Sequence, residues 1–222
     1  MPRITRCIAF LILAVLAAPP ALSADDAGAP PALLRPRAIV IHVHVDVSDR
    51  RFLPRLEAQL SALLTAPVLI VDDTFDLQPL RPDWGKLDAS EGFEAYARTR
   101  IDWRNQASVM HFLLIADDMR RPPARYNFAV SAGDATTAVH LGIVSLHRLQ
   151  ETAWRDGQDE DPVLTASRVF KMIAKNTAKM AGYRSGDRCL LAFPNSLGAL
   201  DAMPESFCEP DSTALARAGI VR

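Results

Sequence analysis

Three side chains that can bind a metal ion alternate along one short segment. His42, His44 and Asp46 lie in the stretch Ala38–Val47, which reads AIVIHVHVDV and has the β-branched residues of a strand. Because successive side chains of a strand point to opposite faces, these three share one face. Imidazole and carboxylate groups there could hold a metal ion. A third histidine in range is not evident, so we interpret the segment as a polar strand face and keep the metal site as the alternative.

Two lysines stand one helical turn apart in a second candidate segment. Lys175 and Lys179 flank Asn176 in the stretch KNTAKMAG. A lysine at neutral pH is an ammonium ion without a free lone pair, so it repels a divalent cation. A buried lysine can lose its proton and act as a base. We expect a solvated basic face instead, since isolated lysines are mostly exposed.

Asn176 shares one stripe of this helix with apolar side chains. A buried amide needs hydrogen-bond partners or costs about 1–3 kcal/mol. We therefore expect Asn176 to be half-buried and hydrogen-bonded at the floor of a cleft. The alternative is an asparagine at the edge of the stripe that faces water.

Residues 1–24 have the layout of a secretory signal peptide. Arg3 and Arg6 precede an apolar run from Ile8 to Ala18, and small residues follow two prolines. The run is too short to span a bilayer comfortably, although an uncleaved anchor is the alternative. We expect an exported protein, periplasmic or secreted, with no membrane span after cleavage.

Removal of this segment takes Cys7 with it and leaves Cys189 and Cys208. An isolated pair in an oxidising compartment is often a disulfide. The alternative is two free buried thiols.

The rest of the chain is typical of a globular α/β domain. Of its 222 residues 49% are hydrophobic and 23% charged, and the net charge of −1 gives no basic stripe for nucleic acid.

Residues 25–37, rich in Pro and Ala, read as a tether to a domain at 38–222, of which 183–222 form a smaller C-terminal part. Hydrophobic periodicity predicts strands at 38–47, 68–71, 109–115, 126–131 and 137–145 and helices at 52–64, 93–105 and 163–182, with a loop at 72–92. Strands that alternate with helices favour an α/β fold.

Several segments resemble the archaemetzincin family of metallopeptidases over roughly residues 38–215. Asn127-Phe128-Ala129-Val130 is similar to an edge-strand motif of the family, and VSLHRL at 144–149 to the segment that follows it. Further on, CLLAFPNSL at 189–197 resembles a family stretch CxMxFSNSL, and PESFC at 204–208 resembles PEFC. The resemblance implies a metzincin-like twisted mixed sheet with flanking helices and a small irregular C-terminal subdomain.

The resemblance also implies a zinc motif, H-E-x-x-H-x-x-G, on the long helix, and this chain departs from it. Lys175 and Lys179 stand where the two histidines should be, and Asn176 stands where the glutamate should be. The third histidine of the family matches Ser185 at best. A zinc hydrolase needs two imidazoles on one metal and a carboxylate that takes the proton of the bound water. We therefore expect no catalytic residues and no metal or other cofactor.

The structural zinc site of the family, which has four cysteines, is also changed. Only Cys189 and Cys208 persist, and Asp211 stands at the fourth position. Two thiolates do not complete a tetrahedral site, so a disulfide in place of zinc is expected, and it could contribute about 3 kcal/mol. Leu191 takes the place of the Met-turn methionine.

Three functional hypotheses follow. The first is an exported, inactive archaemetzincin-like protein that binds a peptide or protein partner through the inherited cleft, with Asn127–Val130 taking an extended peptide by strand addition and Lys175 and Lys179 favouring acidic groups. The second is a divergent zinc-dependent metallopeptidase with relocated ligands, such as His42 and His44. The third is a structural partner in the cell envelope with no peptide groove in use.

Overall fold

A five-stranded sheet organises the part of the chain that the computed structural model describes, residues 32–81, 85–99, 108–120, 131–136, 139–150, 161–184 and 187–222. Its order is β2-β1-β4-β7-β6. The strands are β1 (Ala38–His44), β2 (Val68–Asp73), β4 (Val109–Ile115), β6 (Ser131–Thr136) and β7 (Val139–Ser145). The first four in the order are parallel, and β6 pairs antiparallel with β7 at one edge. The predicted α/β class and mixed sheet are confirmed.

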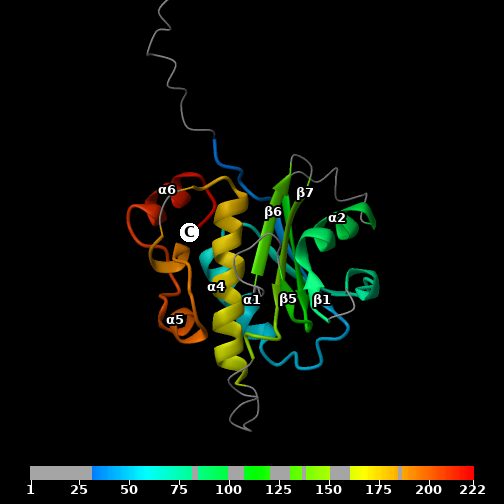
Figure 1. The fold of residues 1–222 in the computed structure, drawn as a ribbon. Coiled ribbons are helices and arrows are strands. Elements are labelled where there is room, and N and C mark those ends of the chain that lie inside the picture. The colour runs from blue at the N-terminus through cyan, green and yellow to red at the C-terminus, as the bar shows by residue number, and fades with distance from the viewer. Residues whose placement is uncertain are drawn as a thin grey trace, which may run out of the picture. The chain divides into compact units, whose positions relative to one another are not determined.

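Helices α1 (Leu53–Leu63) and α4 (Pro162–Met180) cover one face of this sheet (Figure 1). The apolar residues of the α1 segment recur every four positions, and Phe52, Leu56, Leu60 and Leu64 are all buried. They pack with Ile39, Ile41 and Val43 of β1 into the larger core. The predicted helix at 52–64 is therefore confirmed to within a residue at each end.

A second, smaller core lies on the opposite face under α2 (Ala89–Thr99) and the short 3-10 helix η2 (Gln78–Leu80). The loop predicted at 72–92 is wrong in part, since β2 runs to Asp73, β3 (Leu87–Asp88) pairs with β5 (Met119–Arg120), and α2 begins at Ala89. The Asp88 carboxylate accepts hydrogen bonds from the backbone N–H groups of Ser90 and Glu91. This cap starts the helix four residues before the predicted Phe93.

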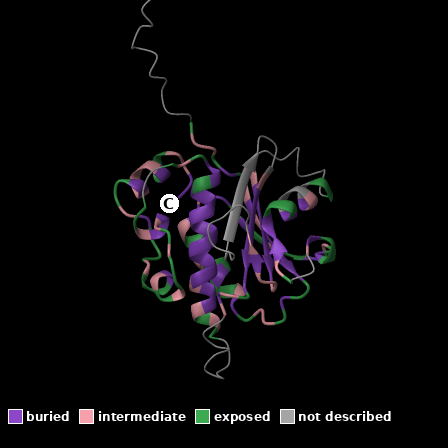
Figure 2. Ribbon diagram, in the orientation of Figure 1, coloured by how far each residue is buried: buried purple, intermediate pink, exposed green. Residues whose placement is uncertain are grey.

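The C-terminal part lies beside α4 and is built from short elements, η4 (Cys189–Leu191), α5 (Leu197–Ala202) and α6 (Asp211–Arg217). Figure 2 shows that α4 is buried along most of its length, since the sheet lies on one side and this C-terminal part on another. A helix covered in this way carries buried polar groups as well as apolar ones.

Two glycines are required by the geometry. Gly142 of β7 lies opposite Phe112 of β4, and a Cβ atom there would collide with the Phe112 ring. Gly182 has a φ of +93° and follows the last turn of α4, where the left-handed conformation that ends a helix favours glycine.

Several predicted segments lie partly or wholly outside the described residues, among them positions 25–31 of the tether, 100–105 of the helix predicted at 93–105 and 137–138 of the strand predicted at 137–145. The signal segment 1–24 is outside them, and of the strand predicted at 126–131 only Ser131 is described, as the first residue of β6. The predicted tether overlaps the compact unit, which begins at Ala32. Leu33 and Leu34 pack against the larger core, and the N–H of Leu34 donates to the Ala181 carbonyl at 2.9 Å. No helix within the described ranges is long and apolar enough to cross a membrane.

Candidate functional site

The second half of α4 carries the positions that the sequence singles out. Asp161 caps the helix, since its carboxylate accepts from the N–H of Val163 at 2.8 Å, and Pro162 occupies the first turn. The helix then runs antiparallel to β7, so that its C-terminal half lies at the end of the sheet where β7 begins (Figure 1). Capping at one end and Gly182 at the other thus fix the place of Lys175, Asn176 and Lys179.

Lys175 is buried, with 7% of its surface exposed. The prediction that it belongs to a solvated basic face is therefore wrong. Its Nζ donates a hydrogen bond to the Ala192 carbonyl at 2.6 Å and lies 5.3 Å from the centroid of the Phe193 ring. Burial, followed by the charge of Lys179, lowers the pKa of Lys175 to about 8, and the charge of Asp187 opposes this. The segment from Ala192 to Phe193 returns from far along the chain to cover this lysine, which helical periodicity alone does not predict.

Lys175 is the last of three buried cations on α4 that we call the cation ladder, Arg168, Lys171 and Lys175. They follow at intervals of three and four residues and so lie on one face of the helix. Arg168 is bidentate to Asp201 at 2.6 Å and also donates to the Leu149 carbonyl. Lys171 donates to the backbone carbonyls of Leu200 and Asp201, at 2.9 and 3.1 Å. The ladder joins α4 to the C-terminal part.

The two lysines of the ladder differ from Arg168 in lacking a carboxylate. No Asp or Glu of the described residues forms an ion pair with Lys171 or Lys175 through its side chain. Burial lowers the pKa of Lys171 as well, although the charges of Glu205 and Asp201 raise it. Both ammonium groups therefore rely on backbone carbonyl oxygens, which carry only partial charge.

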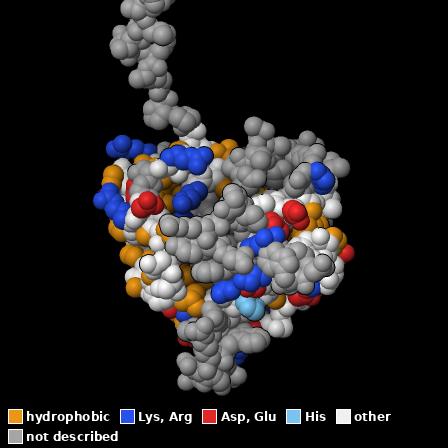
Figure 3. Space-filling view, in the orientation of Figure 1, with side chains coloured by type: hydrophobic (Ala, Val, Ile, Leu, Met, Phe, Trp, Pro, Cys, Tyr) orange, Lys and Arg blue, Asp and Glu red, His pale blue; other side chains and the backbone are white. Residues whose placement is uncertain are grey.

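Asn176 and Lys179 complete the described part of this site. Asn176 is more deeply buried than expected, at 9% exposure, and its Nδ2 has no hydrogen-bond partner in the described structure. Lys179 is exposed. Ser185 lies outside the described residues, as do Asn127, Phe128, Ala129 and Val130, which precede β6 in the sequence. Figure 3 shows that the face carrying α4 bears Lys and Arg side chains in several separate places.

These residues do not fit a catalytic zinc ion. Zinc needs lone pairs from imidazole, thiolate or carboxylate groups. The Lys175 ammonium instead donates to a carbonyl, and an amide follows it in the sequence. Within the described ranges no group of three or more His, Cys, Asp and Glu side chains is placed to hold a metal ion.

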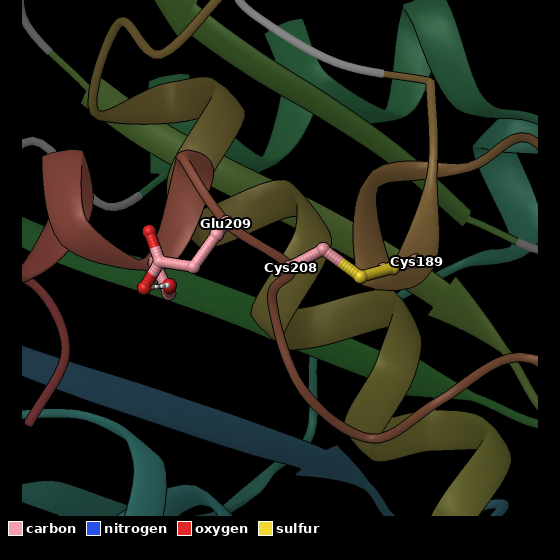
Figure 4. The surroundings of a disulfide bond; sticks show 4 residues. Cys189, Cys208 and Glu209 are labelled. Atoms are coloured by element: carbon pink, nitrogen blue, oxygen red, sulfur yellow. Dashed lines mark hydrogen bonds between the residues drawn. A yellow bond between two sulfur atoms is a disulfide. The ribbon is translucent and has the colours of Figure 1, made fainter.

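Cys189 and Cys208 form a disulfide with their Cα atoms 5.8 Å apart (Figure 4). It joins η4 to the segment that leads into α6. Asp211, which stands at a cysteine position in the family resemblance, is buried, and its Oδ1 accepts from the Tyr183 hydroxyl at 2.7 Å. Leu191 is buried in the larger core. The C-terminal part is thus fastened by a covalent bond and by polar contacts.

His42 and His44 lie on the α2 side of the sheet and are buried, at 7% and 4% exposure. Nδ1 of His42 is 3.3 Å from Oδ2 of Asp73, and its Nε2 is 3.1 Å from Nδ1 of His111. Nε2 of His44 is 2.7 Å from the Phe75 carbonyl oxygen. Both nitrogens of His42 thus face partners within the chain, and the two histidines do not converge on a common point.

The same network contains two side chains, Asp73 and Tyr96, that were not among the candidates from the sequence. The Tyr96 hydroxyl donates to the Asp73 carboxylate, and the N–H of Phe75 donates to the other Asp73 oxygen at 2.7 Å. Asp73 reaches His42 because β1 and β2 are parallel neighbours, in a register that pairs His44 with Asp73. The signal available in the sequence was the carboxylate pair Asp72-Asp73 directly after a strand, which was assigned to a loop.

Comparisons with known proteins show where this fold occurs. No family model and no curated protein matches the chain. A zinc-dependent peptidase from Methanocorpusculum labreanum is similar in structure, with a TM-score of 0.66 and 23% sequence identity over 80% of this chain and 100% of that one. An archaemetzincin from Methanopyrus kandleri has a TM-score of 0.61 and 17% identity, over 82% of this chain and 95% of that one. An archaemetzincin from Archaeoglobus fulgidus, complexed with malonate, has a TM-score of 0.59 and 16% identity, over 79% of this chain and 99% of that one. The chain therefore has the fold of the archaemetzincins, as the sequence resemblance predicts.

Proposed function

We propose that this chain is an exported, catalytically inactive protein of the archaemetzincin fold that binds a peptide or protein partner where its structural neighbours cleave one. The observation that carries the proposal is the buried ammonium of Lys175, which occupies the position that the resemblance gives to the first zinc histidine. An ammonium there replaces a metal ligand by a fixed positive charge. The site keeps a cation but loses the activated water that hydrolysis needs.

The chemistry of the site favours a partner with negative charge. Lys175 has a single carbonyl acceptor, Lys179 is exposed one turn further on, and Nδ2 of Asn176 lacks an acceptor in the described structure. A carboxylate supplies the acceptor oxygens and the counter-charge that these donors lack. We therefore propose acidic peptides, or the carboxylate at a peptide C-terminus, as ligands, with the extended segment pairing with the edge strand that the sequence predicts at Asn127–Val130.

Export is the second part of the proposal. The positively charged start, the short apolar run and the small residues before position 25 support it, and so does a disulfide between Cys189 and Cys208. Fractionation of cells that express the full chain tests it. Export is supported if the mature protein starts near Asp25 and is found outside the cytoplasm, and is contradicted by a full-length protein that stays inside.

Metal content tests the loss of catalysis most directly. Protein purified under native, oxidising conditions is expected to contain far less than one zinc per chain by inductively coupled plasma mass spectrometry, and to cleave no peptide after zinc is added. Stoichiometric zinc, together with hydrolysis that a chelator abolishes, would instead support the divergent metallopeptidase. The contacts of His42 with Asp73 and His111 argue against His42 and His44 as the zinc ligands of such an enzyme.

Binding is tested with peptides that differ only at the C-terminus. The wild type is expected to bind peptides with a free carboxylate at least several-fold more tightly than the same peptides as C-terminal amides. The double variant Lys175→Met/Lys179→Met should lose this preference, while Lys86→Met, remote in sequence and paired with Asp118, should keep it. Equal binding by the wild type and the double variant would remove α4 from the binding site and favour a structural partner role.

A further inference from the structure

Lysine is rare in this chain, and its distribution is uneven. Of the 25 basic residues, 21 are Arg and only four are Lys. Three of those four, Lys171, Lys175 and Lys179, lie on α4. Arginine supplies positive charge but stays protonated in proteins, whereas a lysine can lose its proton and become a nucleophile. Three of the four lysine amines therefore lie on the helix that corresponds, in the family resemblance, to the zinc helix of the archaemetzincins.

Among the three, Lys175 has the surroundings of a reactive amine. It is buried beneath the Ala192–Phe193 segment, it has a cationic neighbour in Lys179, and no carboxylate of the described residues forms an ion pair with it. Burial without a counter-ion, next to a second cation, is the arrangement that activates lysine nucleophiles. The lowered pKa of Lys175, about 8, agrees with this geometry.

The Lys175 amine lies near the protein surface. Its hydrogen bond to the Ala192 carbonyl is only partly buried, and Phe193 beside it is 72% exposed. By contrast, Lys171 donates to two carbonyl oxygens, and its hydrogen bond to the Leu200 carbonyl is buried. Lys179 is exposed, so it offers a solvated cation rather than a nucleophile. Lys175 is therefore the amine of α4 that combines desolvation with access.

We propose that Lys175 forms a reversible imine with the carbonyl carbon of a small oxo acid, whose carboxylate binds the Lys179 ammonium. We specify an acid because the positively charged Lys179 lies one turn from Lys175 on the same face of α4 and can pair with a carboxylate. The Phe193 ring offers an apolar surface against which the carbon skeleton of such a ligand can pack. This inference uses the same lysines as the proposed peptide site but does not require that a peptide binds there.

The step balances without a cofactor. The Lys175 ammonium first loses a proton to solvent, and the lone pair of its Nζ attacks the carbonyl carbon. The π electrons move to the oxygen, which takes up a proton while the nitrogen releases one, giving a carbinolamine. The hydroxyl then takes up a proton from solvent and leaves as water when the C–O bond breaks, the nitrogen lone pair closes the C=N bond, and the nitrogen releases its remaining proton to solvent. One amine and one carbonyl compound thus yield one imine and one water.

Reductive trapping tests the proposal, with glyoxylate as the probe. The full-length mature protein is incubated with glyoxylate and sodium cyanoborohydride at pH 8, digested, and mapped by mass spectrometry. At that pH about half of a lysine with a pKa of 8 is neutral, against less than about 1% of an ordinary lysine. Modification of Lys175 is expected to be at least about tenfold faster than that of Lys86 or Lys179. Modification in order of exposure, with Lys179 ahead of Lys175, would overturn the proposal.

Two comparisons sharpen the result. Propionaldehyde, which has the aldehyde but not the acid, is expected to modify Lys175 several-fold more slowly than glyoxylate, and equal rates would overturn the oxo acid assignment. The variant Lys175→Arg keeps the charge and removes the amine, so it should lose trapping, and trapping at the wild-type rate would overturn the proposal. If the wild type shows no preference for free peptide C-termini while Lys175 is still trapped, only the proposed function is contradicted, which separates the two proposals.

Discussion

The two faces of the sheet contain buried polar groups that are arranged in opposite ways. Under α2, the side chains of His42, Asp73, Tyr96 and His111 are donors and acceptors for one another. Beside α4, the ammonium groups of Lys171 and Lys175 donate hydrogen bonds only to backbone carbonyls, and Nδ2 of Asn176 lacks a partner in the described structure. We call the first arrangement self-sufficient because its four side chains contact one another, and these contacts stabilise the fold. The second has more donors than acceptors, and such an excess is what a ligand can complete.

The strongest test of this contrast is Asp73→Ala on the α2 side. The change removes an acceptor that the N–H of Phe75 and the Tyr96 hydroxyl share, and it removes one of the partners of His42. We expect the free energy of unfolding to fall by about 3–5 kcal/mol, because each buried donor left unpaired costs about 1–3 kcal/mol. Urea denaturation followed by circular dichroism measures it. The control is Asp72→Ala, an exposed neighbour paired with Arg50, which should cost at most about 1 kcal/mol.

The next effect concerns the disulfide that fastens the C-terminal part next to α4. The variant Cys189→Ser/Cys208→Ser opens a loop with a sequence separation of 19 residues. We expect a loss of about 3 kcal/mol in the free energy of unfolding. The wild type unfolded in the presence of a reductant should give the same value. If oxidised wild type and the double variant unfold alike, the noncovalent contacts alone fasten this part.

A smaller effect of opposite sign is expected for Lys175→Met. Replacing a buried ammonium that has no counter-ion should raise the free energy of unfolding at pH 7 by about 1–2 kcal/mol. The pKa of Lys175 is lowered from 10.5 to about 8 in the folded state, so above pH 8 the unfolded chain binds more protons. Wild-type stability should therefore rise between about pH 8 and 10.5 relative to the variant, and the gap should close.

Urea unfolding of both proteins at pH 7 and pH 10 measures this difference. Lys179→Met serves as the control, and its exposed side chain should change stability by less than about 0.5 kcal/mol. If Lys175→Met is instead strongly destabilising at both pH values, the α4 side is as self-sufficient as the α2 side, and the contrast fails.

The smallest change in stability is expected for Asn176→Leu. The leucine removes a buried amide whose Nδ2 lacks a partner and adds apolar surface on the buried stripe of α4. We expect a gain of up to about 1 kcal/mol in the free energy of unfolding, together with weaker binding of peptides that end in a carboxylate. A loss of stability would indicate that an internal water satisfies the amide, and would place Asn176 with the self-sufficient groups.

The sequence predicts the parts of this fold that depend on local patterns. Hydrophobic periodicity locates β1, α1, β4 and α4, and motif order predicts the archaemetzincin-like architecture. The start of α2 was missed, although Asp88 followed by Glu91 is the pattern of a helix cap. Prolines and a glycine before it obscured the periodicity.

Long-range contacts explain what could not be predicted. Lys175 is buried because Ala192 and Phe193, 17 and 18 positions later, fold back over α4, and no pattern within the helix encodes that return. The His42–Asp73 contact likewise depends on the pairing of two parallel strands separated by a helix. His42 and His44 lie on one face of β1, whereas Asp46 lies beyond the end of the strand in an exposed turn. The burial of the two histidines depends on α2, which periodicity placed too late.

Lys171 and Lys175 hold main-chain oxygens of Leu200, Asp201 and Ala192. Every residue has a backbone carbonyl, so these hydrogen bonds do not depend on the side chains of the loop. The outer surface of residues 192–200 can therefore diverge between related chains, or be redesigned, while the loop stays docked in the same place. A loop that is attached through its backbone can change its side chains while these hydrogen bonds to the fold remain.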